Sequence, residues 1–164
     1  MAMTGAPPVE ASVTTADFVE CYRAHYPRVI RALGLGGADP GAAEDIAQEA
    51  FARSLVHWRR VRRGSNPPGY VYRTAFRLYA RRANLHEEEL PREGVATADL
   101  QQEAATRLTV QSALAAMPPR RRLCATLCFI VGFTPGETAD ALGIAEGTVR
   151  KQLELARDAL RAVL

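Results

Sequence analysis

Hydrophobic side chains recur at helical spacing through most of the chain, most clearly after Asp39. Asp is a favourable N-cap and Pro fits the first helical position, so Asp39 and Pro40 predict a helix start. The residues that then recur every three or four positions predict one stripe facing a core: Ala43, Ile46, Ala47, Ala50, Phe51, Ser54, Leu55 and Trp58. Asp45, Gln48 and Glu49 fall on the opposite face, which leaves them free to meet a partner.

Similar patterns predict a helix on either side of this one. Residues 1–15 are expected to form a disordered lead, with Thr14 or Thr15 as the cap of the earlier helix. The apolar side of that helix is Phe18, Val19, Tyr22, Tyr26, Val29, Ile30 and Leu33. The later helix starts after Asn66 and runs over about 69–84. Its inward candidates are Val71, Thr74, Ala75, Leu78 and Tyr79. The three helices would close a first domain, 16–84.

A second helical unit follows a change in composition. Residues 85–99 have few apolar side chains and a net negative charge, which predicts a flexible linker. In the unit 100–164, Pro118 separates a first helix from one over 120–133. The predicted core positions of the latter are Leu123, Leu127, Ile130 and Val131. The predicted fold class is all-α, with two small helical domains joined by a flexible acidic linker.

The end of the chain has the spacing of a helix-turn-helix. Thr134 and Glu137 match a capping box, Ala139 is small where two helices would cross, and Gly143 permits a sharp turn. The core positions around the turn are Ile144, Val149 and Leu153. The outward positions of the last helix are Thr148, Arg150, Lys151, Gln152, Glu154 and Arg157. Such a set suits contacts with base edges and phosphates, whereas the alternative is a helical hairpin that only packs.

Charge distribution adds a second indication of nucleic acid. The chain has 164 residues, 48% of them hydrophobic, and a net charge of only +3. One basic block contains no acidic residue: Arg53, Arg59, Arg60, Arg62, Arg63, Arg73, Arg77, Arg81 and Arg82. Because Arg makes forked phosphate contacts, this block indicates nucleic acid rather than a solvated face. Aromatic residues interleave with it: Tyr70, Tyr72, Phe76 and Tyr79.

Other kinds of chemistry find little support. The odd number of cysteines and the lack of a secretory leader predict a cytoplasmic protein. Cys124 and Cys128 have no partner pair at metal-ligand spacing, so we expect buried thiols and neither metal nor cofactor. No apolar run approaches a membrane span. The histidines are scattered at His25, His57 and His86, and no nucleophile, paired-carboxylate or phosphate-loop signature predicts an enzyme.

Three segments together resemble the extracytoplasmic-function sigma factors of bacterial RNA polymerase. They are AEDIAQEAF at 43–51, the aromatic and Arg-rich stretch 70–82, and ETADALGIAEGTVRKQL at 137–153. The resemblance extends from about residue 16 to the C-terminus. It implies a factor that docks on core polymerase, melts the minus-ten element of promoter DNA and reads the minus-thirty-five element. The implied polymerase partners are the clamp helices of the largest subunit, beta prime, and the beta flap. A flexible linker would also permit an anti-sigma protein to hold the two domains together.

The resemblance assigns residues to each role. It implies that the clamp helices contact Asp45, Gln48, Glu49 and Ala52. The implied minus-ten contacts are Arg59, Arg60, Arg62, Arg63, Asn66, Tyr70, Arg73, Arg77 and Arg81. The minus-thirty-five contacts would be the six outward residues of the last helix. The acidic residues Glu87, Glu88 and Glu89 are hypothesised to mimic a nucleic-acid backbone inside the polymerase.

Some positions depart from the family pattern. Tyr70, Arg77 and Arg81 stand where the family usually has Trp, Asn and Asp, and Lys151 and Gln152 stand where Ser and Arg are common. We therefore expect an altered base preference. Two other functions remain: a decoy that only binds an anti-sigma protein, and a regulator that binds duplex and recruits nothing. The basic block argues against the decoy, and AEDIAQEAF argues against the stand-alone regulator.

Overall fold

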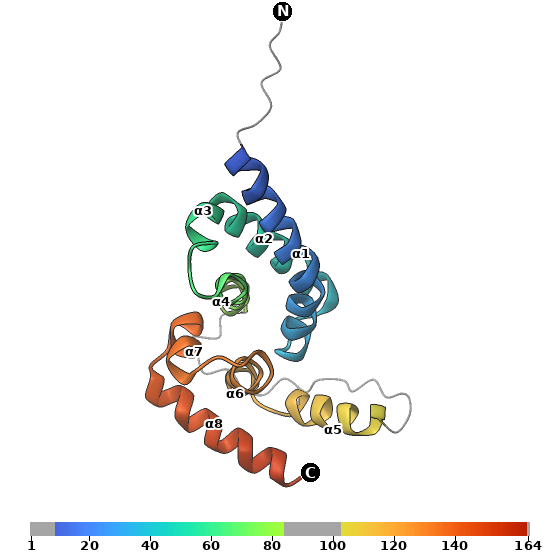
Figure 1. Ribbon diagram of the computed structural model, residues 1–164. Coiled ribbons are helices and arrows are strands. Elements are labelled where there is room, and N and C mark those ends of the chain that lie inside the picture. The colour runs from blue at the N-terminus through green and yellow to red at the C-terminus, as the bar shows by residue number, and fades with distance from the viewer. Residues whose placement is uncertain (1–8, 84–102, 164) are drawn as a thin grey trace, which may run out of the picture.

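All regular structure in the computed structural model, which describes residues 9–83 and 103–163, is helical (Figure 1). The first half contains α1 (Val9–Leu35), α2 (Pro40–Val56), α3 (Trp58–Val61) and α4 (Pro67–Arg82). The second contains α5 (Glu103–Ala115), α6 (Pro119–Ala125), the π-helical turn η1 (Thr126–Val131), α7 (Pro135–Leu142) and α8 (Glu146–Arg161). The predicted all-α class is confirmed. The predicted linker and its glutamates lie outside the described residues.

Side-chain caps start three helices at the predicted places. Asp39 Oδ1 accepts from the Ala42 amide at 3.0 Å, and Asn66 Oδ1 accepts from the Gly69 amide at 3.0 Å. Thr134 and Glu137 form the predicted capping box, with the Glu137 amide donating to Thr134 Oγ1 at 3.1 Å. The first helix differs, because it begins at Val9 rather than near Thr14. No helix-breaking residue separates these two positions, so the helix continues outward.

The central helix ends earlier than its apolar pattern suggests. His57 leaves the helical conformation with φ −104° and ψ 14°, and a short helix, α3, restarts at Trp58. The stripe from Ala43 to Ser54 is buried as predicted, and Trp58 is 3% exposed. The prediction for Leu55 is wrong, since its exposed fraction is 51%. Leu55 still lies within α2, on the same face as exposed Ala52, and Trp58 of α3 completes the core.

Aromatic side chains fill the space between α1 and α2. Phe51 is 2% exposed, and the rings of Phe18, Tyr22 and Tyr26 lie 6.3, 5.1 and 5.9 Å from it, measured between centroids. Phe76 of α4 is fully buried. The sequence pattern groups Phe76 with the aromatic residues available to nucleic acid, and this prediction is wrong because Phe76 is a core residue.

The second half is built around the α7–α8 hairpin and η1. Gly143 ends α7 in the left-handed region with φ 67°, and Val149 and Leu153 of α8 are buried beneath the turn, as predicted. The predicted helix over 120–133 is α up to Ala125 and π from Thr126 onward. A π turn holds more residues than an α turn, which moves Ile130 outward to 48% exposure. The prediction that Ile130 is a core residue is therefore wrong.

The two halves pack directly against each other (Figure 1). α7 packs against α4, and η1 packs against α1. One buried cluster runs through both halves, from Leu33 and Phe76 in the first to Leu123 and Leu127 in the second. The surface of α4 that faces away from α2 is consequently next to the helix-turn-helix.

Candidate nucleic-acid and protein interfaces

The first candidate surface is the solvent face of α2. Asp45, Gln48 and Ala52 are exposed, as their helical spacing predicts. The same face continues to Leu55 and Val56, whose exposed fractions are 51% and 78%. We call these five residues the α2 stripe. Its apolar end was missed from sequence, although Leu55 and Val56 stand three and four positions after Ala52. Exposed aliphatic groups beside polar ones suit a protein partner better than DNA.

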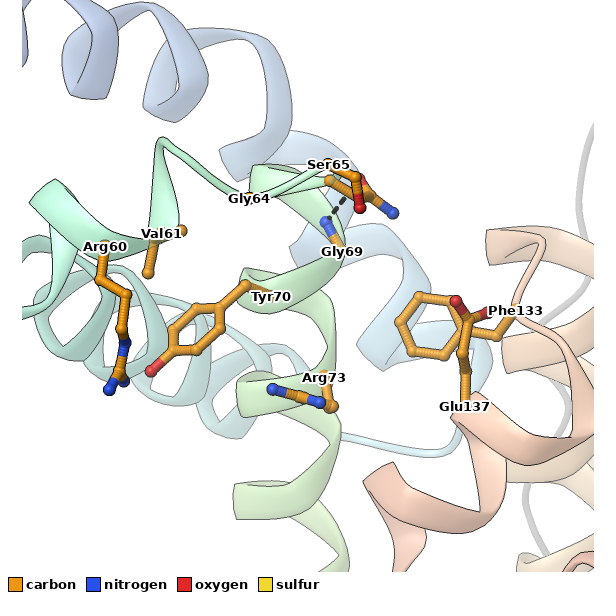
Figure 2. Close-up of a pocket in the computed structure, with 10 residues that line it drawn as sticks. Arg60, Val61, Gly64, Ser65, Gly69, Tyr70, Arg73, Phe133 and Glu137 are labelled. Carbon is orange, nitrogen blue, oxygen red and sulfur yellow. Dashed lines mark hydrogen bonds between the residues drawn. The ribbon is translucent and has the colours of Figure 1, made fainter.

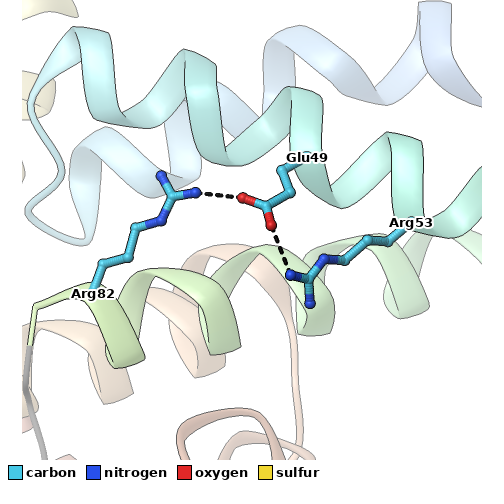
Figure 3. A network of polar contacts seen from close by, with 3 residues as sticks. All are labelled: Glu49, Arg53 and Arg82. Carbon is cyan, nitrogen blue, oxygen red and sulfur yellow. Dashed lines mark hydrogen bonds and ion pairs between the residues drawn. The ribbon is translucent and has the colours of Figure 1, made fainter.

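Glu49, predicted to share that exposed face, is instead engaged inside the molecule. Its carboxylate accepts from Arg53 Nη2 at 2.7 Å and forms an ion pair with Arg82 at the end of α4 (Figure 3). Only 33% of the Glu49 side chain is exposed. The expectation of a freely exposed Glu49 is therefore corrected. The cause is tertiary, because α4 packs against α2 and brings Arg82 to this carboxylate.

The basic loop after α2 divides into free and engaged residues. The exposed arginines of this loop are Arg59, Arg60 and Arg63. Arg62 is half-buried, and its Nη2 donates to Asp17 Oδ2 of α1 at 2.5 Å. Asn66 Oδ1 caps α4 by accepting from the Gly69 amide. Of the five predicted minus-ten residues between Arg59 and Asn66, Arg62 and Asn66 thus stabilise the fold, and the three other arginines are exposed.

A pocket of about 390 Å³ opens where this loop meets the start of α4. Arg60, Tyr70 and Arg73 line it, and Arg73 Cζ lies 5.7 Å from the centroid of the Tyr70 ring. Phe133 and Glu137 reach it from the second half of the chain (Figure 2). An aromatic ring between cations is the arrangement that holds an unstacked base and its phosphates. Glu137 adds a negative charge on the opposite wall.

The outward arginines of α4 lie beside a second pocket, of about 300 Å³. Arg77 and Arg81 are both exposed and line it together with His57. Tyr70 lines both pockets and therefore lies between two pockets that are each lined by arginines. Arg77 is not free: its Nη2 donates to the carbonyl of Asp140 in α7 at 3.0 Å.

The solvent face of α8 is the third candidate surface. Arg150, Lys151, Glu154 and Arg157 are exposed as predicted, whereas Thr148 and Gln152 are half-buried. Gln152 Oε1 accepts from Arg121 Nε of α6 at 3.3 Å. Arg150 Nη2 donates to Glu146 Oε1, one turn earlier on the same helix, at 2.6 Å. Arg157 Cζ lies 5.4 Å from the centroid of the Phe129 ring. These contacts are confined to this half of the molecule.

The cysteines have the surroundings of structural thiols. Burial is the main cause that raises the pKa of Cys124 to about 12, so the thiol stays protonated at neutral pH. Cys124 is buried as predicted, whereas Cys128 is half-buried, and its Sγ lies 3.2 Å from Thr138 Oγ1. Over residues 9–83 and 103–163, no group of three or more His, Cys, Asp or Glu side chains is placed to hold a metal ion. Within the same ranges, no helix is both long and apolar enough to cross a membrane.

Two family descriptions match the chain. Sigma-70 region 2 matches residues 21–84, and Sigma-70, region 4 matches residues 107–160. The ECF RNA polymerase sigma factor SigE of Mycolicibacterium smegmatis is 28% identical over 156 residues, which cover 88% of this chain and 60% of SigE. The chain therefore spans less than two thirds of that relative. The RNA polymerase sigma-E factor of Streptomyces coelicolor is 27% identical over 154 residues, which cover 90% of this chain and 86% of that factor.

Two solved structures share the fold. The sigma factor RpoE of Bartonella quintana, crystallised with the anti-sigma factor NepR, superposes with a TM-score of 0.69 at 18% identity, covering 90% of this chain and 96% of RpoE. CnrH, solved in complex with the cytosolic domain of CnrY, gives a TM-score of 0.59 at 20% identity, covering 90% of this chain and 87% of CnrH. At such identities the likeness is one of fold.

Proposed function

Because the chain belongs to the sigma-70 family of RNA polymerase sigma factors, in its extracytoplasmic-function group, we propose that it directs promoter-specific transcription initiation. The observation that carries the proposal is the presence in one chain of the α2 stripe, an aromatic and Arg-lined pocket, and a helix-turn-helix. We assign polymerase and minus-ten binding to residues 16–84 and minus-thirty-five binding to residues 100–164, with 85–99 as the linker. These roles require no catalytic group of the chain's own and belong in the cytoplasm, where polymerase works.

The α2 stripe would dock on the clamp helices of core polymerase. Asp45 and Gln48 offer polar groups that are exposed, and Leu55 and Val56 offer apolar area that a partner would remove from water. Glu49 would act indirectly, since its ion pair with Arg82 joins α2 to α4 and its ion pair with Arg53 lies within α2. The proposed docking surface therefore differs from the set predicted from sequence by exchanging Glu49 for two aliphatic residues.

The pocket beside Tyr70 would hold a base of the opened minus-ten element. Opening duplex requires surfaces that stabilise an extruded base, because unstacking costs a few kcal/mol. The Tyr70 ring supplies stacking area, while Arg60 and Arg73 supply charge for the backbone. Arg77 and Arg81, in the second pocket, extend the basic track along α4.

The exposed face of α8 would read the minus-thirty-five element. Arg150 and Lys151 are placed early in the helix, where recognition helices contact base edges, and Arg157 lies two turns later for a phosphate. A good forked contact between Arg and guanine is worth about 1 to 3 kcal/mol of discrimination. Half-buried Gln152, held by Arg121, would contribute less to base reading than sequence position alone suggests.

Run-off transcription with core polymerase tests the proposal. Only a sigma factor yields a promoter-dependent transcript from this protein plus core; a decoy or a stand-alone regulator yields none. Asp45→Ala with Gln48→Ala should lower core affinity about tenfold, since truncating interface residues commonly costs over 1 kcal/mol. Glu20→Ala, which removes an exposed carboxylate from α1, is the control and should bind core normally. Full core affinity in the double variant would refute the docking assignment.

A further inference from the structure

The two halves approach each other closely at Gly36, which directly follows α1. A Cβ atom added to Gly36 would lie 3.0 Å from Leu123 Cδ2 of α6 and 3.1 Å from Phe76 Cε1 of α4. Leu123 and Phe76 are both fully or almost fully buried. Gly36 thus stands where α1, α4 and α6 meet, and only a residue without a side chain allows so close an approach. Leu35 packs on a buried cluster of the second half that includes Leu114 and Met117.

Arg122 of α6 forms hydrogen bonds with the end of α1 at the same place. Arg122 Nε donates to the Leu35 carbonyl at 2.6 Å, and Arg122 Nη2 donates to the Gly34 carbonyl at 3.2 Å. These carbonyls belong to the C-terminal end of α1, where unpaired acceptors and the helix dipole favour a cation. Arg122 is half-buried, so its hydrogen bonds are only partly exposed to water. It is therefore the main polar tie between the two halves at this end.

At the other end of the contact, α7 lies over the basic surface of α4. Arg77 donates to the Asp140 carbonyl, and Phe133 and Glu137 line the pocket that contains Tyr70 and Arg73 (Figure 2). The hydrogen bond engages Arg77, which the proposed function assigns to minus-ten DNA, and the pocket places apolar Phe133 and acidic Glu137 near Tyr70 and Arg73. α7 therefore occupies part of the surface that a strand of nucleic acid would use.

We propose that the free chain is closed on itself, with α7 covering the nucleic-acid surface of α4 and Arg122 holding the closed form. The closed form and single-stranded DNA then compete for Tyr70, Arg73 and Arg77. Apparent DNA affinity is the intrinsic affinity multiplied by the open fraction, so weakening the tie strengthens binding. The competition with DNA rests on the proposed function. The closure of the chain on itself does not depend on that function.

Two pairs of variants test this in the full-length chain. Arg122→Ala removes the tie, and its control Arg121→Ala removes the neighbouring cation, whose hydrogen bond to Gln152 stays within the second half. Gly36→Val inserts a wedge without changing charge. Its control is Gly34→Val, because a Cβ at Gly34 has nothing within 4 Å. Circular dichroism checks that each variant is folded.

Small-angle X-ray scattering measures closure, and anisotropy of a short fluorescein-labelled single-stranded oligonucleotide of mixed sequence measures binding. Arg122→Ala and Gly36→Val should both raise the radius of gyration. Arg122→Ala should bind the oligonucleotide about tenfold more tightly, because it loses one or two charged hydrogen bonds. Gly36→Val should also bind it more tightly, because its side chain cannot fit between Leu123 and Phe76 in the closed form. The controls should keep the compact radius and gain no affinity. Loss of a cation by itself weakens DNA binding, so tighter binding by Arg122→Ala has no electrostatic explanation.

An unchanged radius of gyration in both folded test variants would overturn the closed form. An increased radius with unchanged oligonucleotide affinity would overturn the competition. An oligonucleotide that no variant binds would count against the proposed minus-ten role, while the scattering comparison would still decide whether the chain closes on itself.

Discussion

The first half of the molecule is held by contacts between residues far apart in sequence, and the helix-turn-helix by contacts between near neighbours. Arg62 reaches Asp17 and Arg82 reaches Glu49, whereas Thr134 pairs with Glu137 and Arg150 with Glu146. The first arrangement needs the whole helical bundle in place before its contacts form. The second depends largely on local geometry, so the hairpin that carries the exposed face of α8 needs fewer long-range contacts to take its shape.

The largest expected effect is at the aromatic centre of the first half. Phe51→Ala should lower the free energy of unfolding by about 3 to 5 kcal/mol, because it leaves a cavity among Phe18, Tyr22 and Tyr26. Urea denaturation followed by circular dichroism measures the change, with Phe51→Leu as the milder control. A loss below about 1 kcal/mol would mean that long-range packing contributes little to this half.

A substitution in the turn between α7 and α8 should lower the free energy of unfolding by less, because it changes only the local backbone conformation. Gly143 has φ 67°, so Gly143→Ala should cost about 1 to 2 kcal/mol of unfolding free energy through left-handed strain. Gly147→Ala is the control, because Gly147 lies inside α8 with open space around it and Ala favours a helix. The same denaturation experiment applies. Equal effects at both positions would contradict the role of the turn.

Substituting Glu49 and Glu146 compares the stability contributed by a long-range ion pair with that contributed by a local one. Glu49→Gln should cost up to about 1 kcal/mol, since the carboxylate serves both Arg53 and Arg82. Glu146→Gln removes one pair within α8 and should cost about 0.3 to 0.5 kcal/mol. Both losses should shrink in high salt. If Glu146→Gln lowered the free energy of unfolding more than Glu49→Gln, the contrast between long-range and local contacts would not hold for ion pairs.

The smallest effect concerns pH. Burial, and then the charge of Arg28, lower the pKa of His25 below its ordinary 6.5, so the unfolded chain takes up this proton at a higher pH than the folded one. Stability should therefore fall slightly as pH drops from about 6.5 through the lower folded pKa. His25→Gln should flatten this part of the profile, measured by urea denaturation between neutral pH and about pH 5.5. An unchanged profile would exclude His25 as its source.

The contrast between local and long-range contacts also explains what could be predicted from sequence. The caps at Asp39, Asn66 and Thr134 and the glycine turn depend on residues within a few positions, and each lies where the pattern indicates. Glu49 and Phe76 were misjudged because their surroundings come from another helix. A helical wheel places a residue on a face, but it does not say which other element covers that face.

The candidate surfaces follow the same division. The exposed face of α8 was almost fully predicted, since a single amphipathic helix defines it. The apolar end of the α2 stripe was missed because the hydrophobic pattern assigns Leu55 to the core, whereas α2 continues to Val56 and carries Leu55 and Val56 on its exposed face. The contacts of Arg122 with the end of α1 join residues 87 and 88 positions apart, and no local signal in the sequence indicates them.

The π turn η1 also makes the length of this segment critical. An α helix turns about 100° per residue, so deleting one residue between Thr126 and Val131 would restore ordinary α geometry and swing everything downstream around the helix axis. The capping box at Thr134 would survive as a local motif but would point α7 elsewhere. Single-residue deletions here should therefore lower stability more than substitutions of exposed Phe129 or Ile130. The number of residues in η1 matters more than the identity of its exposed side chains.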